Sequence, residues 1–252
     1  ALGTVIAEWT AVLLAGWLVY RTLNQRKVTA DDFWPKAKIM DWPALLKTAS
    51  SNLDIMLRTL ILVFSFAFFI NQSAKFGDTI LASNHILLQL IAFSAFFLDG
   101  YAFVVEALVG SAIGAKRRDM FDLAVRRSTV LALITAILLA LAIVLAGDIA
   151  VMLMTDISSV RLAANQFLPF AALYVLFSFA AFQLDGIFIG ASFTRQMRDA
   201  AALSIAIYFI AWWALSDRFG IQGLWGAMII YVLARAAALL LFYASLRRSA
   251  GR

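Results

Sequence analysis

Seven long apolar stretches run through this chain of 252 residues and restrict what it can fold into. An α-helix needs roughly 20 consecutive apolar residues to cross a bilayer, and each stretch is close to or above that length. The stretches cover residues 1–20, 53–73, 80–113, 128–147, 164–191, 200–216 and 222–246. The sequence therefore predicts an all-α integral membrane protein with seven transmembrane helices.

The composition supports this prediction and excludes several other classes of protein. Charged residues make up 14% of the chain, whereas soluble domains carry about 25%, so the charges cannot cover a water-facing surface. A nucleic-acid-binding domain is excluded despite the net charge of +6. The chain has no cysteine and one histidine, His85, which excludes a thiolate site and a zinc site of several imidazoles. We expect no cofactor, no metal site and no nucleic-acid partner.

Lysine and arginine are distributed unevenly between the loops. The loops that follow the first to sixth stretches hold six, one, five, one, two and one of these residues, and the C-terminal tail holds three. Cytoplasmic loops are enriched in Lys and Arg. This alternation predicts an odd number of spans, with the N-terminus outside and the C-terminus in the cytoplasm.

The polar stretch 21–52 separates the first apolar stretch from the second. Within it, Asp41-Trp42-Pro43 is typical of a helix start, with Asp as cap and Pro in the first turn. We expect a short amphipathic helix in the cytoplasmic interface, which is either a joint between two bundles or a simple connection.

Because Ala1 already lies in an apolar run with no basic lead-in, we also expect the chain to be a fragment.

Four ionisable residues lie deep in the apolar stretches: Asp99, Glu106, Asp185 and Arg235. Each charge costs roughly 2.5–3.5 kcal/mol at a bilayer centre, so each is expected to face the bundle interior or water. One interpretation is a structural ion-pair lock in which Arg235 is the counter-charge. Three acids and one base do not balance, however, so at least one acid is a candidate for cation coupling or gating, with Asp185 first and Asp99 and Glu106 after it. Asp54 and Arg58, four residues apart near an interface, are expected to pair locally.

A second set of residues is a candidate cavity lining. Tyr174, Ser178 and Asp185 are separated by steps of four and seven, which place them on one helix face. Aromatic residues are dense in the second, third and fifth stretches, and a cavity that they line would suit a lipophilic compound, including a cation. Most of these rings must nevertheless pack or face lipid. The lining candidates are Tyr174, Ser178, Gln183, Phe182 and Phe96.

A short motif occurs twice. Phe-Phe-Leu-Asp-Gly at 96–100 is echoed by Phe-Gln-Leu-Asp-Gly at 182–186. In both copies the acid precedes a glycine, which permits close helix approach and a bend.

The runs LDGYAFVVEALVGSAIGAKRRD (98–119) and FQLDGIFIGASFTRQMRDA (182–200) resemble signatures in the second half of the multidrug and toxic compound extrusion (MATE) transporters, in the DNA-damage-inducible protein F branch. Family members have twelve helices in two six-helix lobes. The resemblance implies that residues 1–20 are the last helix of the first lobe, 21–52 the interlobe linker and 53–252 the complete second lobe.

The resemblance also implies a function. The family exports drugs and other organic compounds in exchange for protons or sodium, which places this chain in a bacterial inner membrane. Its partners would be the bilayer, a small organic substrate and the missing N-terminal lobe of the same polypeptide. Asp185 matches the acidic cation-binding position of sodium-coupled relatives, whereas the proton-coupled branch attributes coupling to the first lobe. Glu106 matches the family pattern as an architectural or gating residue.

Three other functions compete with an efflux antiporter. A flippase for lipid-linked sugars shares the wider architecture, but it needs cationic residues facing the cavity to hold a pyrophosphate, and only Arg235 and Arg58 are candidates. An intramembrane enzyme finds no support, because the chain has no metal-binding H-E-x-x-H and no nucleophile elbow. A scaffold without transport activity does not explain the unbalanced buried acids.

Overall fold

The computed structural model describes residues 2–26 and 40–251, and these ranges are helical with no strand. Six helices are long and apolar enough to cross a membrane, which confirms the all-α membrane class. Their bounds are α1 Leu2–Gln25, α4 Trp42–Ala74, α5 Asp78–Gly114, α6 Arg118–Met154, α7 Ser158–Gly190 and α8 Thr194–Ser249. The chain divides into two compact units, residues 1–50 and residues 51–252.

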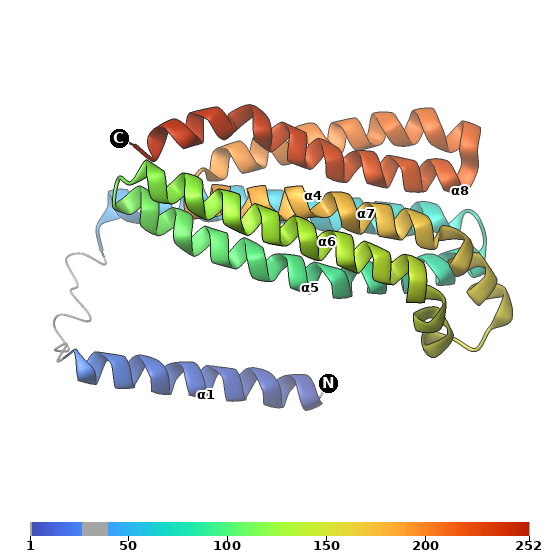
Figure 1. The fold of residues 1–252 in the computed structure, drawn as a ribbon, viewed down its shortest axis with the longest axis horizontal. Helices are drawn as coiled ribbons and strands as arrows, with labels where there is room; N and C mark the ends of the chain where they lie inside the picture. Colours follow the sequence, from blue (N-terminus) through green and yellow to red (C-terminus); the bar gives the residue numbers. More distant parts are fainter. Residues whose placement is uncertain (1, 27–39, 252) are drawn as a thin grey trace. The chain divides into compact units, whose positions relative to one another are not determined.

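The prediction of seven separate helices is not confirmed, because the last two predicted spans lie within α8. This element has 56 residues, and its backbone leaves helical geometry at Gly220, with φ 56° and ψ −129°. Glycine adopts a positive φ without the steric penalty of a Cβ atom. The rings of Tyr208 and Tyr231 lie 5.2 Å apart, so the two arms of α8 fold back on each other, as Figure 1 shows.

The predicted polar linker is described only in part. Residues 27–39, with most of its charges, lie outside the described residues. The predicted helix start is confirmed, since α4 begins at Trp42. A separate short interfacial helix is wrong, however: no glycine or proline interrupts residues 44–74, and α4 continues to Ala74 without a break. The assignment of residues 1–20 to a preceding lobe stays a prediction.

Helix α7 is the centre of the unit formed by residues 51–252. It packs against α5, α6 and α8, and Figure 1 shows it running between them. Over half of its apolar window, 56%, is buried, compared with 28% for α5 and 22% for α6. A side chain on α7 is therefore surrounded by other helices, whereas much of α5 and α6 faces outward.

Two glycines set the distance between α7 and α5. A Cβ atom on Gly186 would collide with the carbonyl oxygen of Ala102, and one on Gly190 with that of Glu106. The spacing Gly-x-x-x-Gly lets two membrane helices approach with their backbones in contact. The predicted close approach beside Asp185 is thus confirmed, and it brings α7 against the middle of α5.

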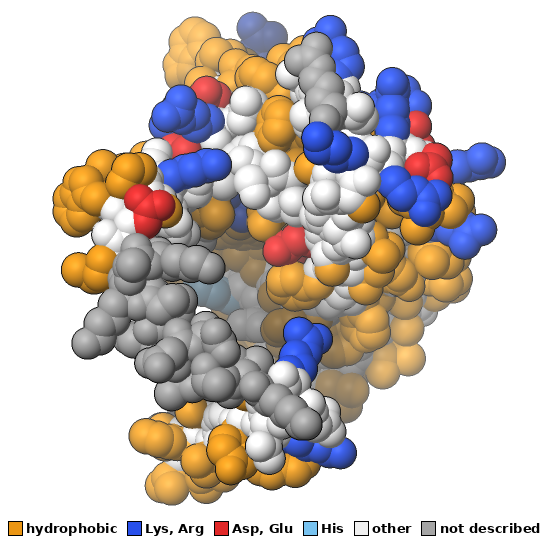
Figure 2. Space-filling model, turned by 90° about the vertical axis from the view of Figure 1, so that its left-hand side faces the viewer, with side chains coloured by type: hydrophobic (Ala, Val, Ile, Leu, Met, Phe, Trp, Pro, Cys, Tyr) orange, Lys and Arg blue, Asp and Glu red, His pale blue; other side chains and the backbone are white. Residues whose placement is uncertain are grey.

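Helices α5 and α7 end in the same type of turn. The Arg117 amide donates to the carbonyl of Ala112 at 2.9 Å, and the Phe193 amide donates to that of Phe188 at the same distance. Lys116 and Ser192 take the positive φ that this C-terminal cap requires. Lys and Arg side chains gather on the end of the molecule where these turns lie (Figure 2).

Candidate functional site

A cavity of about 690 Å³ lies among α4, α5, α7 and the second arm of α8. Most of its wall is aliphatic or aromatic, and it includes Phe66, Ile70, Leu88, Ala92 and Phe182. The phenol ring of Tyr174 packs edge-on against Phe66 at 6.2 Å between centroids. Pockets of 300–1,000 Å³ with apolar walls and a few polar groups hold small organic molecules, and this cavity falls in that range.

The polar groups on the cavity wall come from residues distant in sequence. Asp99, Tyr174, Ser178 and Arg235 all line it, together with His85. Asp99 is partly buried and makes no ion pair with any residue that the structure describes. The cavity wall therefore carries one carboxylate that can bind a cation, that of Asp99, and one guanidinium that already forms an ion pair, that of Arg235.

Asp185 lies behind this wall and is held by two arginines. Its Oδ2 accepts a hydrogen bond from Nη2 of Arg235 at 2.7 Å and another from Nη2 of Arg58. Asp185 is 7% exposed and Arg235 is 8% exposed. In such a low-dielectric site the opposite charges stabilise one another, and removing Asp185 leaves both arginines without a counter-charge. The triad ties α4, α7 and α8 together.

Arg58 is the member of this triad that sequence reasoning missed, and the predicted local pair with Asp54 is wrong. Asp54 instead accepts hydrogen bonds from Arg198 Nη1 at 2.7 Å and from the Thr194 hydroxyl at 3.3 Å. The one available signal was that Arg58 lies inside an apolar run, where a cation needs a buried partner.

With Arg58 included, the charges near the cavity balance. Asp99 and Asp185 carry two formal negative charges, and Arg58 and Arg235 carry two positive ones. The shortage of bases inferred from the sequence is therefore reduced, and Glu106, the third acid of that count, makes no ion pair among the described residues. Because both arginines contact Asp185, the balance is uneven in space: Asp185 is doubly paired and Asp99 is not paired.

Three other predicted site residues lie away from the cavity lining. Glu106 is partly buried on α5, seven residues beyond Asp99. Gln183 is 2% exposed and accepts a hydrogen bond from the Ser128 hydroxyl at 3.0 Å, so it faces α6. Phe96 is 75% exposed on the outer side of α5.

A bundle of membrane-length helices around a solute-sized, partly charged cavity defines a multi-pass membrane protein with an internal binding space. The chain belongs to the MatE family, whose model matches residues 55–213.

Relatives of known name agree with this family. The chain is 32% identical over 243 residues to DNA damage-inducible protein F of Escherichia coli strain K12. This match covers 95% of this chain and 51% of that protein. It is 25% identical to Protein DETOXIFICATION 42 of Arabidopsis thaliana, over 89% of this chain and 42% of that protein. The chain thus spans about half the length of these curated relatives, or slightly less.

Solved structures show the same fold. The bent form of the Vibrio cholerae MATE transporter VcmN matches with a TM-score of 0.79 at 20% identity, over 92% of this chain and 52% of that one. The eukaryotic MATE transporter AtDTX14 matches with a TM-score of 0.70 at 16% identity, over 89% and 50%. These relatives are transporters and not enzymes.

Proposed function

We propose that this chain is the second lobe of a secondary active antiporter, which exports drugs or other amphipathic organic compounds in exchange for protons or sodium by alternating access. The observation that carries the proposal is the cavity of about 690 Å³ with aromatic walls and a carboxylate, Asp99, that has no ion-pair partner among the described residues. Aromatic faces and a carboxylate together favour a lipophilic cation.

Asp99 is the residue to which we assign cation exchange. An antiporter needs an acid that binds the substrate or the coupling ion in turn, and such an acid must change partner at low cost. Asp99 faces the cavity and has no guanidinium to release. Asp185 would have to leave two arginines, one buried and one partly buried, so we assign it the structural role of holding three helices together.

The same pairing weakens the flippase alternative. Recognition of a pyrophosphate calls for cationic side chains that can form charge-assisted hydrogen bonds. Arg235 lines the cavity and Arg58 contacts the same aspartate behind it, and both already donate to Asp185. A lipid-linked anion would have to compete with that carboxylate.

The chain covers about half of its curated relatives, and we propose that a first lobe supplies the other wall of the transport path. On this proposal the basic end of the bundle and the C-terminus lie in the cytoplasm of a bacterial inner membrane, since that end is rich in Lys and Arg.

Efflux of ethidium, a lipophilic cation, from cells lacking their main pumps tests the proposal. The gene's full reading frame is compared with this chain alone, and the proton and sodium gradients are collapsed separately. We expect the full reading frame to pump under one gradient and this chain alone not to pump. No efflux by the full reading frame under either gradient would overturn the drug-export proposal and favour a lipid-linked cargo.

Two variants of the full reading frame then test the assignment of Asp99. Asp99→Asn removes the charge on the cavity wall, whereas Glu106→Gln removes one on the same helix that does not line the cavity. At matched expression we expect Asp99→Asn to abolish ion-coupled efflux and Glu106→Gln to retain it. The reverse result would move the exchange role to Glu106.

A further inference from the structure

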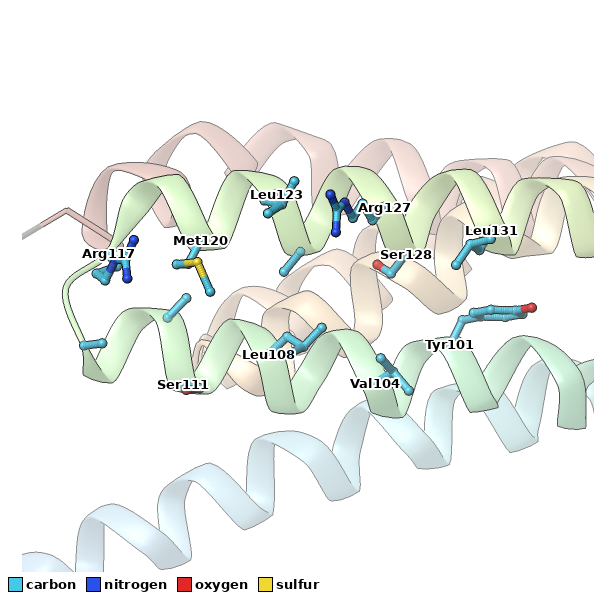
Figure 3. A pocket seen from close by; sticks show the side chains of 13 residues that line it. Tyr101, Val104, Leu108, Ser111, Arg117, Met120, Leu123, Arg127, Ser128 and Leu131 are labelled. Atoms are coloured by element: carbon cyan, nitrogen blue, oxygen red, sulfur yellow. The ribbon is translucent and has the colours of Figure 1, made fainter.

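A second hollow, of about 710 Å³, lies between α5 and α6 and shares no residue with the cavity described above. Figure 3 shows the side chains that line it on the two helices, with Leu108 and Met120 in the space between them. Its apolar wall includes Val104, Leu108, Met120, Leu123 and Leu131. These side chains are 53%, 47%, 45%, 42% and 52% exposed, respectively, so the groove opens to the surroundings of the bundle.

The groove carries positive charge toward the α5–α6 turn. Arg117 lines it at the turn, and Arg127 lines it further along α6, between Leu123 and Ser128 (Figure 3). Arg117 donates to Asp119 at 2.6 Å, whereas Arg127 has neither an ion pair nor a side-chain hydrogen bond within residues 40–251. The other nearby acid, Asp122, is held by Arg247 at 2.7 Å. The charge of Arg127 is thus left for an outside anion.

The dimensions of the groove match one leaflet of a bilayer. A helical side chain leans toward the N-terminus of its helix, so the Arg127 guanidinium is directed back along α6 toward Leu123. From Leu123 to Leu131 the helix rises roughly 12 Å, most of the ~15 Å of hydrocarbon in one leaflet. Leu123 and Leu131 line this stretch together with Arg127 and Ser128, and the Tyr101 phenol at its end accepts from Thr135 at 3.0 Å.

We propose that this groove binds one anionic phospholipid, with its phosphate on Arg127 and one acyl chain along Val104, Leu108 and Leu131. A cation on the wall of an open apolar groove matches the charge and the amphipathic character of such a lipid. A soluble anion would leave the apolar wall unused. A zwitterionic lipid would place its own cation beside Arg127.

Photo-crosslinking in bilayers tests this proposal. The protein of the full reading frame is reconstituted in phosphatidylcholine vesicles that contain either phosphatidylglycerol or phosphatidylcholine with the same photoactivatable acyl chain. Peptides 101–111 and 120–131 are then read by mass spectrometry. We expect about fivefold more label from phosphatidylglycerol, the preference that one arginine near the surface confers.

Arginine variants identify the anchor. Arg127→Gln is expected to reduce phosphatidylglycerol labelling to the phosphatidylcholine level, and Arg127→Lys to retain the preference. Arg126→Gln is the matched control, because Arg126 is the neighbouring exposed arginine and does not line the groove. Equal labelling by the two lipids, or an equal loss in both Gln variants, would overturn the site.

The acyl chain is tested separately. Leu131→Trp narrows the groove and should lower labelling severalfold, whereas Leu138→Trp, on an exposed position of the same helix outside the groove, should not. Inorganic phosphate at constant ionic strength is added as a competitor. Full competition would show that a soluble anion is the occupant, and absence of lipid label from the groove peptides would show that protein closes it; either result contradicts the proposal.

Discussion

The two Leu-Asp-Gly segments, 98–100 on α5 and 184–186 on α7, have the same sequence and opposite surroundings. Asp185 is 7% exposed and bonded to two arginines, whereas Asp99 faces the cavity with no such partner in the described ranges. A Cβ atom on Gly186 would collide with α5, but one on Gly100 would meet open space.

The flanking residues differ in the same way. Phe182 lines the cavity, and its counterpart Phe96 is 75% exposed. The cause is the position of the helix: α7 is enclosed by its neighbours and α5 is not. The two copies of the motif therefore carry the same carboxylate. The packing of each helix decides whether that carboxylate stabilises the fold, as at Asp185, or faces the cavity without an ion-pair partner, as at Asp99. Substituting equivalent positions in pairs tests this conclusion.

The largest difference is expected between the two aspartates. Asp185→Asn leaves the buried guanidinium of Arg235 and the partly buried one of Arg58 without a counter-charge, and should destabilise the bundle by about 3–5 kcal/mol. Asp99→Asn removes an unpaired charge and should change stability by less than about 1 kcal/mol. Thermal unfolding of the purified protein in detergent measures both. Equal losses would show that Asp99 also holds the fold.

A smaller difference is expected between the two glycines. Gly186→Ala forces α7 away from the carbonyl oxygen of Ala102, and such overpacking costs about 1–3 kcal/mol. Gly100→Ala adds a methyl group in open space and should stabilise the helix by up to about 1 kcal/mol. The same melting experiment compares them. If both substitutions stabilise the protein, the close contact of α5 and α7 is not required.

The smallest effect concerns the two phenylalanines and is seen in binding. Phe182→Ala removes an aromatic face from the cavity wall and should weaken ethidium binding by about two- to tenfold, which corresponds to 0.5–1.5 kcal/mol. Phe96→Ala should leave the Kd unchanged. Fluorescence titration of the full reading frame's protein checks both values. A matching loss in Phe96→Ala would place the ligand outside this cavity.

Much of the fold followed from local sequence. The apolar stretches located the helices because the bilayer requires long apolar runs, and Asp41-Trp42-Pro43 located the start of α4. The ends of α5 lie within two residues of the predicted stretch 80–113. The ends of α6 were less predictable, since it runs from Arg118 to Met154 and its first turns are polar, where hydropathy gives no signal. The predicted break between the spans 200–216 and 222–246 contains Gly220, where the backbone of α8 leaves helical geometry. The structure has one helical element there, however, and not two.

The site was predictable in its residue types and not in its partners. Asp99, Tyr174, Ser178, Phe182 and Arg235 were all selected as polar or aromatic groups in apolar helices, and all lie on the cavity wall. The partnership of Arg58 with Asp185 joins residues 127 positions apart, and no local spacing encodes it. Gly186 and Gly190 form a Gly-x-x-x-Gly motif, which is a sequence signal for close packing of membrane helices.

The triad of Arg58, Asp185 and Arg235 also constrains the order in which the protein can be built. A chain enters the membrane from its N-terminus during synthesis, so α4 brings Arg58 before its acid exists, and Asp185 follows before Arg235. Each lone charge in the bilayer carries a cost of roughly 2.5–3.5 kcal/mol. The triad is therefore complete only after the second arm of α8 has inserted, because until then Asp185 has Arg58 as its one partner in it.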